Sequence, residues 1–355
     1  MTTPPERAGV STEATPATGV CAPEVAGLVD AAQALAAGQL VAFPTETVYG
    51  LGARADDDAA VARIFAAKGR PSDHPLIVHV CDQGGAEAFA GQMPAPAQRL
   101  IDAFWPGPVT VIVPRAPGRG AAAAGGQASI GLRCPAHPVA LALLRACAGL
   151  GVPGVAAPSA NRFGRISPTT AAHVREEFGP GLIVLDGGAC QVGIESAIID
   201  CTRQQPVLLR PGLLTREMLQ QVLGEPLAEP DAHSPRASGT LEAHYAPRAR
   251  LRLADVAGLD LLAGHGAGLA VYSRSRPALP QGAVWRAMPA TPELAARCLF
   301  ADLRALDRAD IQQIWVEQPP RLPEWEGVRD RLRRAAAAGL EAGPNSGPAH
   351  EQETT

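Results

Sequence analysis

The stretch LVAFPTETVYGLGA at residues 40–53 decides the fold, because a short apolar run is followed at once by a polar turn. Leu40 to Phe43 are apolar, and Pro44 ends the run. A short apolar run ended by proline is typical of a buried strand, since proline cannot donate to a sheet ladder. The segment after Pro44 is predicted to form a turn. Its threonines, carboxylate and tyrosine either bind a small polar ligand or cap backbone groups.

Outward from this stretch, apolar runs and helical patterns alternate irregularly. Several predicted strands follow one another with no helix between them, which indicates an α/β fold with a mixed sheet rather than a strictly alternating one. The predicted strands of this part are Leu40–Phe43, Leu76–Val80, Val109–Val113, Ser129–Arg133, Val155–Ala157, Leu182–Leu185, Ala197–Asp200 and Val207–Arg210. The predicted helices are Pro23–Ala37, Asp58–Ala67, Ala97–Phe104, Val139–Cys147, Thr170–Phe178 and Thr215–Val222.

Residues 224–239 are rich in Pro, Ser and Gly, which is typical of a linker between domains. A second α/β pattern follows, with strands at Leu269–Tyr272 and Ile311–Glu317 and helices at Pro292–Arg308 and Val328–Ala338. We therefore predict a disordered leader (1–21), a first domain (22–223), a linker (224–248), a small α/β domain (249–340) and a disordered tail (341–355).

Composition excludes several classes of protein. A net charge of −4 argues against a chain whose main task is to hold nucleic acid, which usually needs a basic balance. The sequence has no apolar run long enough to cross a membrane and no secretory signal pattern, so a cytoplasmic location is expected. The seven cysteines form no C-x-x-C pair, and neither a zinc site nor a disulfide framework is predicted.

Lys68 is the only lysine, and the remaining 30 of the 31 basic residues are arginine. Lysine carries a compact point charge, whereas arginine offers a planar fork. Two interpretations of this bias stay open. Lys68 contacts a phosphate or carboxylate that a guanidinium would fit badly, or it is a chance survivor on the surface.

Further polar residues stand at strand ends. Ser129 and Arg133 bound an apolar strand, and an arginine in that place suits bidentate capture of a carboxylate or phosphate, or an ordinary salt bridge. Small residues surround Ser159 and Asn161, which lets the backbone approach a ligand. Together these clusters predict an anion-binding cleft. No phosphate-binding P-loop, nucleophile elbow or H-E-x-x-H motif is present.

Six motifs occur in an order that resembles the YrdC-like threonylcarbamoyl-AMP synthase family. They are FPTETVYGLGA, KGRP followed by HPLIVHV, PSANRFG with SPT, LDGG, GIESAIID and LRPG, and they span residues 40–212. The later HYAP at residues 244–247 resembles the longer, two-domain branch. The resemblance implies a twisted mixed sheet with flanking helices that form a concave cleft. It also implies a linker that passes over this cleft into a small C-terminal Rossmann-like α/β domain.

The resemblance also implies an activity. It predicts a nucleotidyltransferase, an L-threonylcarbamoyladenylate synthase, that joins L-threonine, bicarbonate and ATP and releases pyrophosphate. The product would serve threonylcarbamoyladenosine formation in tRNAs that read codons starting with A. Transferase proteins that modify tRNA would be downstream partners, and a weak contact with tRNA is a further expectation.

Site residues are carried over by motif. The catalytic pairs are Lys68, Arg70, Ser159 and Asn161. The threonine side is Thr47, His79, Arg133, Ser159 and Ser196. The ATP side is Arg70, His74, Ser129, Ala157, Ser167, Arg210, His244 and Tyr245.

These residue types fit that chemistry. Arg133 suits the threonine carboxylate, while Lys68, Arg70 and Mg²⁺ would stabilise charge on phosphate oxygens. Glu46 either helps with Mg²⁺ or the threonine amine, or it caps a turn. The ligands of the metal are not predicted, and neither is a covalent enzyme intermediate.

Two alternatives stay open. The same fold resembles proteins that bind double-stranded RNA, and a cleft with Lys68, Arg70, Arg162, Arg165 and Arg210 could hold a phosphate backbone. The fold also resembles carbamoyltransferases of hydrogenase maturation. Those proteins carry zinc-finger-like segments, for which this sequence lacks the cysteine pairs.

Overall fold

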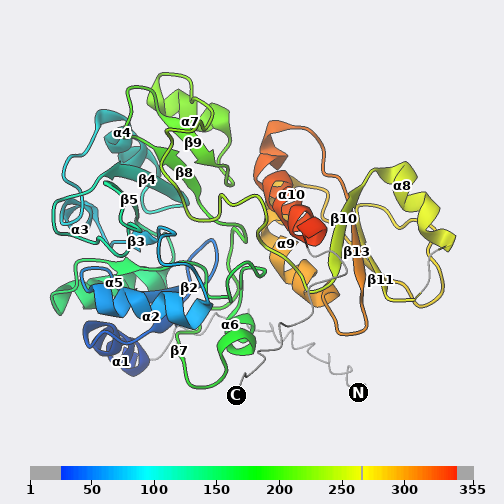
Figure 1. Cartoon of the computed structure of the whole chain (residues 1–355), viewed down its shortest axis with the longest axis horizontal. Helices are drawn as coiled ribbons and strands as arrows, with labels where there is room; N and C mark the ends of the chain where they lie inside the picture. Colours follow the sequence, from blue (N-terminus) through cyan, green and yellow to red (C-terminus); the bar gives the residue numbers. More distant parts are fainter. Residues whose placement is uncertain (1–24, 265–266, 342–355) are drawn as a thin grey trace, which may run out of the picture.

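The computed structural model describes residues 25–264 and 267–341. Two sheets with their own helices stand beside each other, and the chain crosses once between them (Figure 1). The predicted leader lies outside the described residues, as does Cys21. The predicted tail also lies outside them, except for residue 341, which ends a helix.

The first part is a nine-stranded mixed sheet in the order β7-β1-β2-β6-β3-β5-β4-β8-β9. Its strands are β1 (Val41–Phe43), β2 (Gly50–Arg54), β3 (Ile77–His79), β4 (Val109–Pro114), β5 (Ser129–Arg133), β6 (Val155–Ala156), β7 (Ile183–Val184), β8 (Ala197–Asp200) and β9 (Val207–Arg210). Its helices are α1 (Val25–Ala36), α2 (Asp58–Lys68), α3 (Gln83–Glu87), α4 (Ala95–Phe104), α5 (Pro138–Gly149), α6 (Ala171–Phe178) and α7 (Arg216–Leu223). The predicted mixed α/β fold is confirmed.

The two faces of this sheet differ in what covers them. Helices α2, α4 and α7 pack on one face in a large apolar core, and α1 and α5 pack on the other face over β1 and β6. The apolar side chains of Ile77, Ile112 and Ile198 form a separate small cluster, and Ala228 and Ala237 of the segment that leads to the second part pack against it. Residues 224–249, which we call the connecting segment, therefore cross the sheet at this cluster.

The second part is a four-stranded parallel sheet in the order β10-β13-β11-β12. Its elements are β10 (Arg250–Ala254), α8 (Val256–Asp260), η1 (Leu261–Gly264), β11 (Leu269–Ser273), β12 (Val284–Ala287), α9 (Pro292–Leu306), β13 (Gln313–Glu317), η2 (Pro323–Trp325) and α10 (Glu326–Glu341). Helices α9 and α10 lie between this sheet and the first part (Figure 1). The two parts therefore meet through helices of the second.

Some predicted elements were wrong or incomplete. Gly50–Gly52 belongs to strand β2 rather than to a turn, where Gly50, Leu51 and Gly52 pair with residues of β1. Glycine is a poor strand former, which hid this strand from the pattern. In the second part, β10 and β12 were not predicted, and neither was the short helix α8. Within the described residues no helix is long and apolar enough to span a membrane.

Candidate active site

A narrow pocket of about 30 Å³ lies where strand ends, the turn after β1 and the connecting segment meet. Its lining combines five cationic or imidazole side chains with hydroxyls and small residues. The lining residues are Thr45, Thr47, Val48, Gly50, Arg70, Ile77, His79, Arg133, Ala157, Pro158, Ser159, Glu195, Arg210, Ser238, Gly239, His244 and Tyr245. Residues from stretches of the chain that are far apart in the sequence thus converge on one pocket.

The structure brings the predicted site residues together. Nine of them line the pocket: Thr47, Arg70, His79, Arg133, Ala157, Ser159, Arg210, His244 and Tyr245. Ser167 and Ser196 stand directly behind the lining, bound to Glu195 and to Arg210. His74 and Ser129 line two small cavities next to it, which share Arg70, Ile77 and Ser238 with the pocket. Lys68 and Asn161 form the support under Ser159, as described next.

Lys68 is buried and ends helix α2. Its Nζ donates to the carbonyl of Ser159 at 2.7 Å and to the carbonyl of Asn161. The K-x-R and S-x-N motifs, far apart in the sequence, are thereby joined by one ammonium group. Burial, followed by the charge of Arg70, lowers the pKa of Lys68 well below its ordinary value. The two backbone carbonyls accept two of the three donors that the ammonium form of the side chain has.

On the side predicted to hold threonine, Arg133 is buried and makes an ion pair with Glu46 at 2.6 Å. Its guanidinium also donates to the Thr47 hydroxyl at 2.9 Å and to the Gly107 carbonyl at 3.3 Å. Glu46 in turn accepts from the backbone N–H of Ala136. Glu46 therefore acts as the counter-ion that orients Arg133, and part of the guanidinium fork remains free to bind a carboxylate.

His79 stands beside Arg133 through the parallel pairing of β3 and β5. Burial, followed by the charge of Arg133, lowers the pKa of His79 to about 3. The ring is therefore neutral at physiological pH, and its Nδ1 has no partner within the described residues. A neutral imidazole offers a hydrogen bond without adding charge.

On the side predicted to hold ATP, Arg70 and Arg210 are buried and form no ion pair with a carboxylate in the described part of the chain. Arg70 donates to the Pro75 carbonyl, and burial lowers its pKa to about 10. Arg210 donates to the carbonyls of Ser196 and Ser238. A buried cation without a counter-ion is costly. These two arginines, with Lys68, therefore mark a place for an anion.

The connecting segment closes the pocket. Tyr245 has a left-handed backbone (φ 62°), which is uncommon for a residue other than glycine and often occurs at functional sites. Gly239 also has a positive φ, and a Cβ there would lie 2.6 Å from the Tyr245 hydroxyl and 2.7 Å from Arg210. His244 is buried next to Tyr245, with ring centroids 4.1 Å apart. Burial lowers the pKa of His244 to about 3.

Buried polar atoms without a partner gather at this pocket. Of eight such side-chain atoms in the described residues, five belong to predicted site residues: Arg70 Nε, His79 Nδ1, Asn161 Oδ1, His244 Nδ1 and the Tyr245 hydroxyl. Native proteins satisfy nearly all buried polar groups, and the exceptions often mark a missing partner. Their concentration here is what a site for a polar ligand requires.

Sequence reasoning missed several lining residues. Glu195 and Thr45 lie inside motifs that had been singled out, so the motifs themselves were the available signal. Ser238 and Gly239 lie in the connecting segment, where no local pattern indicates contact with the pocket.

No group of three or more His, Cys, Asp or Glu in the described part of the chain is arranged to hold a metal ion. The two carboxylates of the pocket region, Glu46 and Glu195, each face an arginine. The protein side chains alone therefore do not fit a resident metal site.

Two family models match the chain. The Sua5, YciO and YrdC model, described as telomere recombination, matches residues 33–212. The model described as threonylcarbamoyl-AMP synthase, C-terminal domain, matches residues 214–337.

Individual relatives agree. The threonylcarbamoyl-AMP synthase of Pyrococcus abyssi is 45% identical over 220 residues, which cover 60% of this chain and 64% of that protein. The Schizosaccharomyces pombe protein of the same name is 33% identical, covering 87% of this chain and 86% of that one. The crystal structure of P. abyssi Sua5 complexed with L-threonine is similar with a TM-score of 0.79 and 37% identity, covering 88% of this chain and 94% of that one. The chain therefore belongs to the Sua5/YciO/YrdC family, in the form that also carries the C-terminal domain of threonylcarbamoyl-AMP synthases.

Proposed function

We propose that this protein synthesises L-threonylcarbamoyl-AMP from L-threonine, bicarbonate and ATP and releases pyrophosphate. The observation that carries the proposal is the set of buried basic residues Lys68, Arg70 and Arg210, none of which makes a direct ion pair with a carboxylate among the described residues. The charge of Glu195 acts on Arg210 without such a contact. ATP would supply the missing negative charge. The relatives named threonylcarbamoyl-AMP synthase and the Sua5 structure with L-threonine support the choice of reaction.

In this proposal Arg133 binds the threonine carboxylate, while Glu46 and Thr47 hold the guanidinium in place. The amine nitrogen of threonine joins the carbon of bicarbonate, and water leaves to give a carbamate. A carbamate oxygen then attacks the α-phosphorus of ATP, and the bond to the β-phosphate oxygen breaks. Charge grows on phosphate oxygens in this step, where Lys68 and Arg70 stabilise it. Positioning the three reactants supplies much of the remaining rate.

Mg²⁺ remains a proposed companion of ATP. A magnesium ion in nucleotide sites is commonly held by phosphates with few protein carboxylates. That would suit a pocket whose carboxylates are already paired with arginines. We assign no protein ligand to it and no step through it.

The pocket volume of about 30 Å³ is far below the several hundred Å³ that a ligand of this size needs. Ser238, Gly239, His244 and Tyr245 of the connecting segment supply one wall. We therefore propose that this segment moves aside when ATP and threonine enter.

A role mainly in RNA binding has less support. Lys68, Arg70 and Arg210 are buried, so they cannot reach a phosphate backbone while the connecting segment is in place. Arg162 is exposed, and Arg165 pairs with Asp307 at 3.5 Å. Contact with tRNA, supply of the product to tRNA-modifying transferases and a cytoplasmic location remain proposals.

The test is pyrophosphate release by the purified chain with ATP, Mg²⁺, bicarbonate and L-threonine, with each omitted in turn. We expect release to require both threonine and bicarbonate. Lys68→Ala should lower it by at least about a hundredfold, because a charge-assisted contact and the support of Ser159 are both lost. Arg63→Ala, on the exposed side of α2, is the matched control and should change little. Release that ignores threonine, or salt-sensitive tRNA binding without release, would contradict the proposal.

A further inference from the structure

Ser167 is predicted on the ATP side of the site, and its hydroxyl is fixed by Glu195. The hydroxyl donates to Glu195 Oε1 at 2.5 Å, and both residues are buried. Glu195 also lines the pocket. A serine hydroxyl can rotate freely unless it is bound, so Glu195 determines where the Ser167 oxygen lone pairs point.

Glu195 is itself held by Arg331 of helix α10, which belongs to the second part of the chain. Arg331 Nε donates to Glu195 Oε2 at 2.9 Å, and its other nitrogens donate to the carbonyls of Glu195 at 3.0 Å and Pro211 at 2.7 Å. The guanidinium also lies over the Tyr245 ring at 5.6 Å. The side chain of Arg331 is 0% exposed. Arg331, a residue of the second part, thus contacts two residues that line the pocket, Glu195 and Tyr245.

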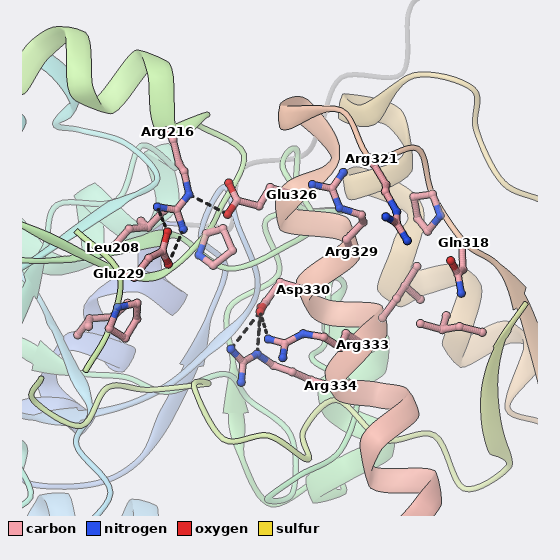
Figure 2. Close-up of a pocket in the computed structure, with 16 residues that line it drawn as sticks. Leu208, Arg216, Glu229, Gln318, Arg321, Glu326, Arg329, Asp330, Arg333 and Arg334 are labelled. Atoms are coloured by element: carbon pink, nitrogen blue, oxygen red, sulfur yellow. Dashed lines mark hydrogen bonds and ion pairs between the residues drawn. The ribbon is translucent and has the colours of Figure 1, made fainter. Parts of the chain in front are cut away.

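Arg331 shares Asp330 with two other arginines of α10, Arg333 and Arg334. Arg334 also donates to the carbonyls of Thr240 and Leu241 in the connecting segment. Figure 2 shows Arg333 and Arg334 bound to Asp330 on the side of α10 that lines a cavity of about 560 Å³ between the two parts. The side chain of Arg333 is 65% exposed, and its one ion pair among residues 25–264 and 267–341 is with Asp330. Arg331 and Arg333 are therefore two arginines of one helix, of which only the first reaches the site.

A second arginine holds Ser167 through its backbone. Arg304 of helix α9 donates to the carbonyls of Ile166 and Ser167 and makes an ion pair with Glu177 at 2.8 Å. Its side chain is 12% exposed. Ser167 is thus held at its carbonyl by Arg304 and at its hydroxyl, through Glu195, by Arg331.

The two parts of the chain approach closely enough for these contacts because glycines lie where their backbones meet. A Cβ on Gly193 would lie 2.4 Å from the backbone of Arg297 in α9. A Cβ on Gly327 in α10 would lie 2.4 Å from the carbonyl of Gly212. Gly193 precedes Glu195 in the sequence and Gly212 follows it. The backbone of the second part therefore packs directly against the first part on both sides of Glu195.

We propose that the second part of the chain contributes two positioning residues to the active site, Arg304 and Arg331, which orient Ser167 and Glu195 for binding the nucleotide. This inference rests on the proposed function, because it assigns Ser167 to ATP. It gives the C-terminal domain a defined task in the reaction, and it predicts that loss of either arginine affects ATP rather than threonine.

The experiment compares Arg331→Met and Arg304→Met in the full chain with Arg333→Met as the matched control on the same helix. Steady-state constants for ATP and for threonine are measured separately, and ATP binding is measured directly by titration without threonine. Melting temperatures show whether each variant folds. Arg331→Lys, which keeps the charge but not the fork, tests the geometry of the contact.

We expect KM for ATP and the ATP dissociation constant to rise by about tenfold or more in both methionine variants, through the loss of charge-assisted hydrogen bonds. KM for threonine should stay within about twofold. Arg331→Lys should recover part of the loss, and Arg333→Met should behave like the unmodified chain.

A pH profile separates positioning from simple support. Burial alone would raise the pKa of Glu195, but Arg331, Arg210 and the Ser167 hydroxyl hold it below its ordinary value. Without Arg331 the Glu195 carboxyl should take up a proton nearer neutral pH, and ATP binding should then weaken as pH falls from about 8 to 6. The double variant Glu195→Gln with Arg331→Met should lose this pH dependence.

Two results would overturn the inference. One is a lower melting temperature in the methionine variants with unchanged ATP binding and KM, which would make both arginines structural only. The other is an equal rise in KM for threonine. If the unmodified chain binds ATP but releases no threonine-dependent pyrophosphate, the proposed function fails instead, and the ATP titration still tests the two arginines.

Discussion

At the scale of single residues, the lone lysine has a structural place that an arginine would fill badly. Lys68 is buried, and its ammonium lies between two backbone carbonyls of the turn that carries Ser159 and Asn161. A compact ammonium fits between two single acceptors, whereas a guanidinium needs a wider, planar partner. The alternative interpretation placed Lys68 on the surface, and this was wrong because the side chain is buried. Contact of Lys68 with a phosphate stays a prediction.

The substitution Lys68→Arg tests this place directly. It preserves charge but adds volume in a closed space, so we expect the turn to shift and stability to fall by about 1–3 kcal/mol. Pyrophosphate release should fall by about tenfold or more. The reverse change Arg63→Lys, at an exposed position of the same helix, is the control. Native activity and stability in Lys68→Arg would mean that the retained lysine has no specific role.

Residue-level prediction reached nine of the residues that line the pocket but not their partners. The motifs predicted Arg133 and Thr47, and Glu46 was expected to cap a turn or to assist substrate. Its ion pair with Arg133 joins residues 87 positions apart. Such a contact follows from the order of strands in the sheet, which single residues do not encode.

At the scale of elements, glycines appear where packing leaves no room for a side chain. Gly52 in β2 is one case, because a Cβ there would lie 2.8 Å from Val155 and 2.9 Å from the Phe43 ring. The same residue made β2 look like a turn, since glycine disfavours strands. In contrast, β10 reads Arg-Leu-Arg-Leu, an alternation that does indicate a strand but adjoins the predicted linker.

The contact between α10 and the first part yields a prediction. In Gly327→Ala the new Cβ would lie 2.4 Å from the Gly212 carbonyl and 2.8 Å from Ile194, so backbone must shift. We expect a loss of about 1–3 kcal/mol in the free energy of unfolding. KM for ATP should also rise, because Arg331 follows on the same helix. Thermal unfolding and steady-state kinetics measure the two effects.

The control for this change is Gly149→Ala near the end of α5. A Cβ at Gly149 would have no neighbour within 4 Å. Alanine should then stabilise slightly, by up to about 1 kcal/mol, because it restricts the unfolded chain. If Gly327→Ala is as harmless as Gly149→Ala, the close contact between the two parts does not constrain the site.

At the scale of the whole molecule, folding buries titratable groups that the open chain would expose. His79 and His244 are the clearest cases, with pKa values lowered to about 3 by burial and by nearby cations. Arg133 faces His79, while Arg70, Lys68 and Arg210 face His244 together with Glu195. The neutral rings are therefore a property of the assembled site.

The sign of the resulting pH dependence follows from proton uptake. The unfolded chain protonates each histidine near its ordinary pKa of about 6.5, whereas the folded chain does so only near 3. Between pH 6.5 and 3 unfolding takes up protons. The contribution of the neutral histidines to the free energy of unfolding is therefore complete above about pH 6.5 and is lost as the pH falls. At pH 5 each of these two histidines should lower the free energy of unfolding by about 2 kcal/mol relative to pH 7.

Urea unfolding at pH 7, 6 and 5 measures this loss. His79→Gln and His244→Gln should each flatten the dependence, and the exposed His233→Gln should leave it unchanged. A loss of stability that persists in full in both variants would show that other groups titrate on unfolding.

The sequence by itself determined the α/β class, most strands and helices of the first part, the family and nine of the residues that line the pocket. These follow from local patterns and ordered motifs, which act over a few residues each. Only the tertiary structure decided which groups meet: Lys68 with the Ser159 turn, Glu46 with Arg133, and Arg304 and Arg331 of the second part with Ser167 and Glu195. Burial and charge neutralisation depend on three-dimensional neighbours drawn from distant parts of the chain, and no local pattern specifies those neighbours.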